Sequence, residues 1–169
     1  MDGNARFFSA SVTVNEHLIL DILDHHGEYI THDTEANLSR RFHRDWDGEC
    51  KRADILALYR KDDAEYLVGI EVKDWKNRVN ARMCYRYLKT YRRSCQYFYF
   101  AAREFSKRAF DIHEIGFIDL NQMKVIKKPE YLYPPKRFRE GVVKKLKNAP
   151  PPRRYFVMHP HQRKLDNYY

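Results

Sequence analysis

Two apolar segments separated by a short polar turn constrain the fold of this chain most strongly. The segment "RADILALYR" places apolar residues on both sides of an extended chain, and "YLVGIEVK" does the same until Glu71 interrupts it. A strand with two apolar faces is typical of a sheet that is covered on both sides. The intervening "KDDAE" is short enough for a hairpin. The segments therefore predict an antiparallel strand pair inside such a sheet.

A long amphipathic segment follows this hairpin, and an aromatic strand follows the amphipathic segment. Residues 77–93 predict a helix that Asn77 would cap and whose apolar face would hold Ala81, Cys84, Leu88 and Tyr91. "CQYFYFAA" then predicts a strand, "REFSKRAFDIH" a short helix, and "EIGFIDL" and "MKVIKK" two further strands. A strand, a helix and a strand in this order predict a crossover between parallel strands.

The N-terminal part supplies a first helix and a further strand. Thr13 and Glu16 have the spacing of a capping box, apolar residues continue at helical spacing to Leu23, and Gly27 is a plausible stop. Residues 28–50 are the least legible part of the chain, and "EYITHDTE" is compatible with an extended strand. The predicted order is α, β, β, β, α, β with additions, so the fold class is α/β. We expect a central mixed sheet of about four to six strands flanked by helices.

The charge of the chain is concentrated near its C-terminus. The net charge is +9, and residues 127–169 account for all of it, because residues 1–126 contain equal numbers of basic and acidic side chains. All seven prolines also lie from Pro129 onward. We therefore predict a compact domain over residues 1–128 and a basic extension, rich in proline and aromatic residues, over residues 129–169. One short helix is expected there, around "REGVVKKLKN".

Composition also bears on location. No apolar run approaches the roughly 18 residues of a membrane span, and the first residues lack the basic start and apolar middle of a secretion signal. We expect no membrane partner and an intracellular protein, in the cytoplasm or nucleoid, or in the host cytoplasm if the protein is viral. Cys50, Cys84 and Cys95 lack the spacing of a metal site and are expected to be free thiols.

Charged residues interrupt the central strand pair at one end. Glu71 and Lys73 are two positions apart, so a strand would place them side by side on one face. Pairing of the two strands would bring Asp54 within reach of them near the open end of the hairpin. Two carboxylates suit a hard cation such as Mg²⁺. A neighbouring lysine could orient a water molecule or offset charge that develops in a transition state.

These segments resemble the PD-(D/E)xK nuclease superfamily, which has the restriction-endonuclease-like fold. The resemblance rests on "RADILAL" and "VGIEVKDWK", with a helix carrying Glu16 before them and a basic helix and "YFYFAA" after them, and it covers about residues 13–120. It implies that Asp54 and Glu71 are catalytic residues that bind Mg²⁺, for which Mn²⁺ is a substitute, and that Lys73 is the catalytic lysine of the motif. It implies the hydrolysis of DNA phosphodiester bonds, by an endonuclease or a structure-specific enzyme in DNA repair or recombination.

The sequence departs from the superfamily pattern in two places. Ala53 stands where the motif has proline, and no glutamine precedes Tyr87, so the glutamine–tyrosine signature of the RecB-like branch is absent. The branch therefore stays open. Glu16 corresponds to a metal-binding acid that some branches carry on the first helix, and it is equally well explained as a capping-box residue.

Two groups of basic residues are candidates for nucleic-acid contact. One group forms a stripe on the predicted second helix, and the other lies in the C-terminal extension: Arg78, Arg82, Arg86, Lys89 and Arg93, and then Lys136, Arg137, Arg139, Arg153 and Arg154. Phosphate contact is one interpretation of the stripe, and an ordinary solvated helix face is the other. The extension could contact nucleic acid through its basic and aromatic side chains, or pack onto the domain or a neighbouring subunit.

The sequence thus predicts a metal-dependent DNA nuclease, a hydrolase with DNA as its partner. A homodimer is a further expectation, because many members of the superfamily cut two strands with two sites. Two alternatives remain: a nucleic-acid-binding protein on the same fold that does not cut, and a nuclease directed at RNA.

Overall fold

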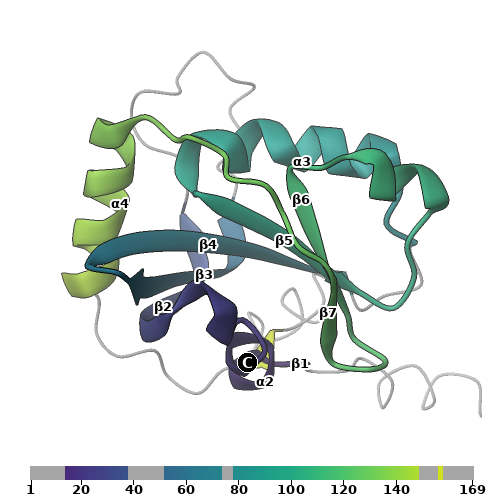
Figure 1. Ribbon diagram of the computed structural model, residues 1–169, viewed down its shortest axis with the longest axis horizontal. Helices are drawn as coiled ribbons and strands as arrows, with labels where there is room; N and C mark the ends of the chain where they lie inside the picture. The colour runs from purple at the N-terminus through teal and green to yellow at the C-terminus, as the bar shows by residue number, and fades with distance from the viewer. Residues whose placement is uncertain (1–13, 38–51, 74–77, 149–155, 158–169) are drawn as a thin grey trace, which may run out of the picture.

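The computed structural model describes residues 14–37, 52–73, 78–148 and 156–157 and has an α/β fold (Figure 1). Its centre is a mixed sheet of six strands in the order β2-β3-β4-β5-β6-β7, flanked by helices. The predicted fold class is therefore confirmed. The bounds of these strands are Glu28–Asn37 for β2, Arg52–Lys61 for β3, Ala64–Lys73 for β4, Tyr97–Ala102 for β5, Ile115–Asp119 for β6 and Lys124–Lys127 for β7.

The pairing of the strands follows the predicted hairpin and crossover. Strands β2, β3 and β4 are antiparallel neighbours, β4, β5 and β6 are parallel, and β7 returns antiparallel to β6. Asp62 and Asp63 form the turn between β3 and β4, with φ angles of 50° and 61°. Two consecutive positive φ angles suit the twist of a tight hairpin, and aspartate tolerates this conformation better than most residues do.

Helix α3 (Ala81–Ser94) is the crossover between β4 and β5. It begins later than the sequence predicts, because the side chain of Asn80 accepts a hydrogen bond from the Met83 amide at 2.9 Å and caps the helix. Just before this cap, Val79 forms a bridge with Phe105 in an extended conformation. The predicted cap, Asn77, lies outside the described residues. The predicted apolar face is confirmed, since Cys84, Leu88 and Tyr91 are buried.

The first helix is shorter than predicted. Val14–Asn15 form strand β1, which pairs antiparallel with β8 (Phe156–Val157), so helix α2 spans only Glu16–Asp21. A 3-10 turn, η1, follows at Asp24–His26. Gly27 ends it with a φ of 115°, and a Cβ there would collide with the backbone of Arg60. The capping box cannot be followed, because Thr13 lies outside the described residues.

Two helical layers cover the two faces of the sheet (Figure 1). Helices α3 and α4 (Lys136–Asn148) pack on the face that presents Leu56, Leu58 and Leu67. Helix α2 packs on the other face through a core that includes Ile55, Ala57, Tyr59, Ile19 and Leu23. Alternate residues of β3 thus point into different cores, as the apolar pattern predicts. We call these two sides of the sheet the α3 face and the α2 face.

The first half of the C-terminal extension packs on the domain. The predicted helix is present as α4, and Leu132, Val142 and Leu146 are buried in the core of the α3 face. Another 3-10 turn, η3, spans Lys107–Asp111 where a short helix was expected. Cys84 and Cys95 are free and buried as predicted, whereas Cys50 lies outside the described residues. Among the described helices, none combines the length and apolar character needed to cross a membrane.

Candidate active site

Asp54, Glu71 and Lys73 meet at one end of the β3–β4 pair. Strand β4 runs antiparallel to β3 with Ile55 opposite Ile70, so the start of β3 lies beside the end of β4. The Val72 amide donates a hydrogen bond to Oδ2 of Asp54 at 2.8 Å, which fixes the aspartate across the strand pair. Asp54 and Glu71 are both largely buried, with exposed fractions of 8% and 3% for the whole residues.

Glu71 is the centre of the cluster. The Tyr91 hydroxyl donates a hydrogen bond to its Oε1 at 2.6 Å, and the Lys73 ammonium donates one to its Oε2 at 3.1 Å. Burial, and then the nearby charge of Asp54, raise the pKa of Glu71 well above that of an ordinary glutamate. Burial and Asp54 thus favour the neutral form of Glu71, whereas the Lys73 ammonium and the Tyr91 hydroxyl favour its carboxylate and lower this pKa.

Lys73 keeps its positive charge. Burial alone would lower the pKa of this lysine, but the carboxylates of Glu71 and Asp54 outweigh burial and raise it above its ordinary value. The ammonium also lies 4.7 Å from the centre of the Tyr87 ring, a cation–π contact. A lysine in this state donates hydrogen bonds and supplies charge, and it is a poor proton acceptor.

Two tyrosines of α3 belong to this cluster, and sequence reasoning did not assign them to it. Tyr91 was expected only as part of the apolar helix face, and Tyr87 was noted only because no glutamine precedes it. The signal that could have found them is their spacing of four residues, which places both on one side of a helix that must cover the end of β4. Burial and Glu71 raise the pKa of Tyr91 well above its ordinary value, so its hydroxyl remains a donor.

Gly69 allows Tyr91 to reach the site. A Cβ at this position would collide with the ring of Tyr91, which lies directly over the strand. The ring also stacks on Phe98, with ring centres 3.9 Å apart and planes 4° from parallel. The ring is thus held between β4 and β5, and its hydroxyl is positioned on Glu71 by packing.

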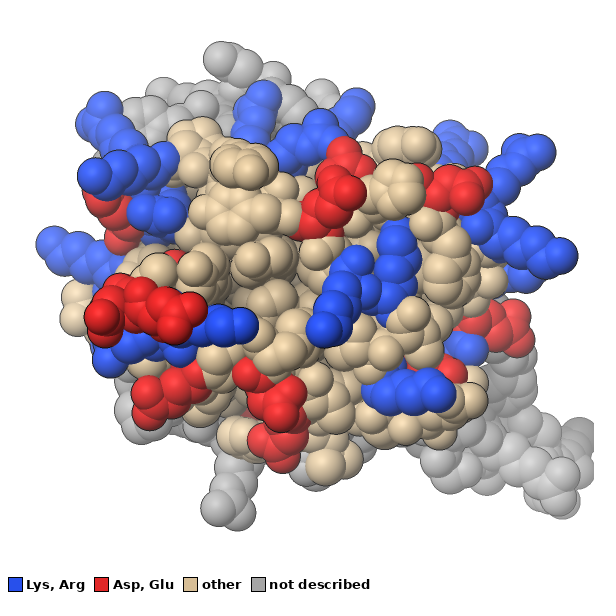
Figure 2. Space-filling model, in the orientation of Figure 1, with Lys and Arg blue, Asp and Glu red and all other residues tan. Residues whose placement is uncertain are grey.

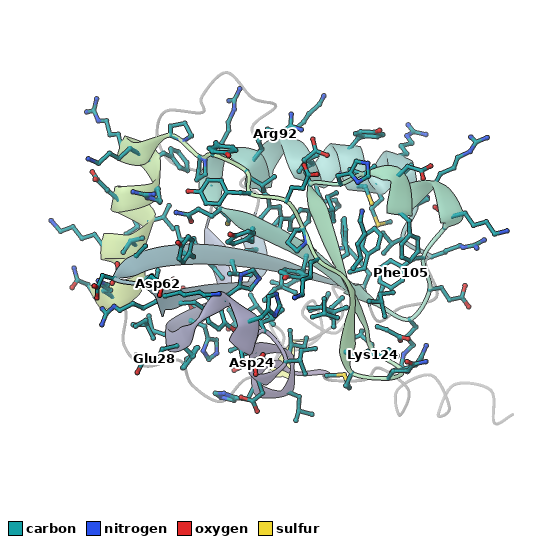
Figure 3. The ribbon with its side chains drawn as sticks, in the orientation of Figure 1. Asp24, Glu28, Asp62, Arg92, Phe105 and Lys124 are labelled. Carbon is teal, nitrogen blue, oxygen red and sulfur yellow. The ribbon has the colours of Figure 1, made fainter. Side chains whose placement is uncertain are left out.

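The structure does not bring Glu16 to this cluster. Glu16 begins α2, and His32 approaches its Oε1 with Nε2 at 3.3 Å. His32 is opposite Ala57, which points into the core of the α2 face, whereas Glu71 contacts α3. The sheet therefore separates Glu16 from Glu71. Figure 3 marks the two sides with Arg92 on α3 and Asp24 after α2.

A second group of potential metal ligands surrounds Glu16. The group consists of Glu16, His17 and His32. Each offers one ligand atom, and the three atoms lie within 4.8 Å of one another. Burial, reinforced by His17, lowers the pKa of His32 to about 4, so the imidazole is neutral near pH 7. The contact between His32 and Glu16 is therefore not an ion pair at that pH. The histidines are scattered in the sequence. His17 on α2 and His32 on β2 come together only because α2 packs beside β2.

The basic stripe of α3 is exposed to solvent. Arg82, Arg86, Lys89 and Arg93 on α3 are exposed, and so is Arg78, which precedes the helix. With 3.6 residues per turn, the stripe lies about half a turn away from Leu88 and Tyr91. It therefore covers the outer side of α3 and does not line the cluster around Glu71. Figure 2 shows Lys and Arg side chains both at the margins and near the centre of this face.

The basic residues of the extension are only partly described. Lys136 and Arg137 are exposed at the start of α4, and Arg139 is half-buried. Lys136 lies 3.8 Å from Glu140 one turn later, so part of its charge is compensated. Arg153 and Arg154 lie outside the described residues.

Comparisons with known proteins give a likeness of fold and no family. No family model and no curated protein matches the chain. Among solved structures, the chain is similar to the SPO1766 protein of unknown function from Silicibacter pomeroyi, with 14% sequence identity and a TM-score of 0.50. The match covers 92% of this chain and 88% of the other. At this identity, the likeness concerns the fold alone.

Proposed function

We propose that the protein is a Mg²⁺-dependent nuclease of the PD-(D/E)xK type that hydrolyses DNA phosphodiester bonds inside the cell. The observation that carries this proposal is the cluster of Asp54, Glu71 and Lys73 at one end of the β3–β4 pair, with direct hydrogen bonds at Glu71 and Asp54. Three charged groups at the end of two otherwise apolar strands are costly to bury. A bound cation would offset the charge of the carboxylates, and a phosphate would offset that of the lysine, so both would lower this cost.

The residues of the cluster fit a hard divalent cation. Asp54 and Glu71 supply oxygen ligands, which Mg²⁺ prefers over nitrogen or sulfur. Burial and mutual repulsion raise the pKa of Glu71, and a cation shared with Asp54 would remove that repulsion. When bound, Mg²⁺ would supply Lewis-acid chemistry, by lowering the pKa of a water molecule and polarising a phosphate oxygen.

The remaining residues of the cluster would position groups and neutralise charge. The Lys73 ammonium, held by Glu71 at 3.1 Å, would offset the negative charge that develops on the phosphate during cleavage. The Tyr91 hydroxyl would hold Glu71 in one orientation. Since the pKa of Lys73 is raised, we assign this lysine an electrostatic role and not that of a general base.

The exposed stripe on α3 supports nucleic acid as the substrate. Four of its cations are on helix α3, which has no acidic residue, and Arg78 precedes the helix. Such a row can bind phosphates along a strand or duplex. Because the stripe faces away from Glu71, it would contact a part of the substrate that flanks the cleaved bond. The same stripe would also serve a protein that binds nucleic acid without cutting it, so binding alone does not test the proposal.

Cleavage assays test this function directly. Supercoiled plasmid, single-stranded DNA, branched DNA and single-stranded RNA would be incubated with the purified protein and Mg²⁺ or Mn²⁺. The variants are Glu71→Gln and Lys73→Ala. Glu65→Gln is the matched control, because Glu65 lies on the same strand at the far end and bonds to Arg60 and Lys147.

We expect metal-dependent cleavage of DNA that both site variants lose and the control retains. If the protein cuts RNA and no DNA substrate, the proposal is replaced by the alternative of a nuclease directed at RNA. If the wild-type protein binds DNA and cuts none of the substrates, the nuclease proposal fails and the binding protein replaces it.

A further inference from the structure

The α2 face carries a group of side chains that the proposed nuclease activity does not use. We propose that Glu16, His17 and His32 bind a transition-metal ion such as Zn²⁺, at a site separate from Asp54 and Glu71. The inference does not depend on nuclease activity, because it rests on different residues, on a different face of the sheet and on a different ligand chemistry.

The spacing of the ligand atoms fits a metal of this size. Bonds of about 2.0–2.1 Å in a tetrahedral arrangement place neighbouring ligand atoms about 3.4 Å apart. Nε2 of His32 and Oε1 of Glu16 are already 3.3 Å apart, and the third ligand atom lies within 4.8 Å of both. That third atom belongs to His17, whose side chain is exposed. A small rotation of an exposed ring would complete the set.

The structure around His32 resembles the support that metal-binding histidines usually have. The Tyr29 hydroxyl lies 2.6 Å from Nδ1 of His32, so this hydrogen bond orients the ring and directs Nε2 towards Glu16. A histidine ligand typically donates the N–H of its second ring nitrogen to a neighbouring acceptor, and the Tyr29 hydroxyl oxygen can accept this bond from Nδ1. The ring of His17 meets the ring of His32 edge to face, with centres 5.2 Å apart.

The elements that carry these ligands are packed onto the central sheet. Ile19, Leu20 and Leu23 anchor α2 and the residues after it in the core of the α2 face, and the Tyr59 hydroxyl bonds to the carbonyl of Leu20 at 3.0 Å. His32 lies within β2, which is paired along its length with β3. A site built on packed elements needs little reorganisation when a metal binds.

The donor set decides which metal is expected. Two imidazoles and one carboxylate suit Zn²⁺ and similar transition ions, whereas Mg²⁺ prefers oxygen ligands throughout. His17 is exposed, so this ligand can be reached from solvent. A metal bound here would join α2 to β2, so binding should stabilise the folded protein.

Metal titration of the full chain tests this inference. Chelator-stripped protein would be titrated with Zn²⁺ by calorimetry and with Co²⁺ by visible absorption, with and without excess Mg²⁺. The variants are His17→Ala, whose side chain is exposed, and His32→Gln. The controls are His113→Ala, which removes an exposed histidine elsewhere, and Glu71→Gln, which alters the other cluster.

We expect the wild-type protein to bind one equivalent of Zn²⁺ that Mg²⁺ does not displace and that raises the melting temperature. His17→Ala should bind this equivalent at least about tenfold more weakly, His32→Gln should lose it, and both controls should retain it. If His32→Gln does not fold, His17→Ala decides the test. The inference is overturned if wild type binds no Zn²⁺, if His17→Ala binds it as wild type does, or if Glu71→Gln loses it.

Discussion

The two faces of the central sheet carry two different kinds of polar cluster. On the α3 face, Asp54 and Glu71 offer only oxygen atoms, and Lys73 adds a positive charge. On the α2 face, Glu16 is accompanied by two imidazoles. The comparison shows that the metal an acidic residue suits depends on the side chains around it. These in turn depend on the face of the sheet on which the residue lies. The same residue type is suited to a hard cation on one face and to a transition metal on the other.

The largest expected difference between the faces concerns the carboxylates themselves. Asp54→Asn should lower Mg²⁺-dependent cleavage by at least about a hundredfold, because it removes a metal ligand. Glu16→Gln should lower it by less than about tenfold, because Glu16 lies across the sheet. Single-turnover cleavage rates measure both. Equal losses in the two variants would mean that Glu16 serves the same site after all.

The second comparison removes one tyrosine hydroxyl from each face. Tyr91→Phe deletes the donor to Glu71, whereas Tyr59→Phe deletes the donor to the Leu20 carbonyl. Each should lower the free energy of unfolding by about 1–2 kcal/mol, as expected for a buried hydrogen bond. Only Tyr91→Phe should also lower cleavage, by about 10–100-fold. Denaturant unfolding gives the free energies, and cleavage rates are measured on the same samples. If Tyr91→Phe cleaves DNA at the wild-type rate, the Tyr91 hydroxyl has no role in cleavage.

The third comparison adds one methyl group to each face. Gly69→Ala would push on the ring of Tyr91, and Gly116→Ala would push on Tyr99 and Pro129. Both substitutions should destabilise the fold by about 1–3 kcal/mol through overpacking. Cleavage measured well below both melting temperatures should fall only in Gly69→Ala. A similar fall in both variants would indicate that lost stability, and not displacement of Tyr91, causes the effect.

The smallest expected effect separates two arginines on one helix. Arg86 belongs to the exposed stripe, whereas Arg92 is 2.9 Å from Glu114 in an ion pair. If Arg86 contacts one phosphate, Arg86→Ala should lower the slope of log K against log salt by about 0.7–0.9. Arg92→Ala should leave this slope nearly unchanged. DNA binding measured at several salt concentrations tests the pair, and identical slopes for Arg86→Ala and wild type would exclude phosphate contact by Arg86.

The pairing of β4 with β3 and with β5, and the meeting of Asp54 with Glu71, followed from the sequence. Both depend on local rules: alternation along a strand, the length of a hairpin, and the parallel pairing imposed by a crossover helix. The start of α3 was misplaced because two asparagines compete for the cap, and the bridge between Val79 and Phe105 decides between them.

The contacts between layers could not be predicted in this way. The position of Glu16 depends on how α2 docks against β2, and the hydroxyl of Tyr91 reaches Glu71 only because Gly69 leaves room for its ring. Such contacts arise from packing between segments far apart in the chain. The sequence names the residues involved but does not state which face each one will occupy.

A crystal grown with Mn²⁺ would test the central claim most directly. Anomalous scattering locates manganese without any assumption about activity. The account predicts a peak within about 2.0–2.4 Å of carboxylate oxygens from both Asp54 and Glu71, with the Lys73 ammonium nearby. Absence of a peak between these two carboxylates at saturating Mn²⁺ would contradict the account.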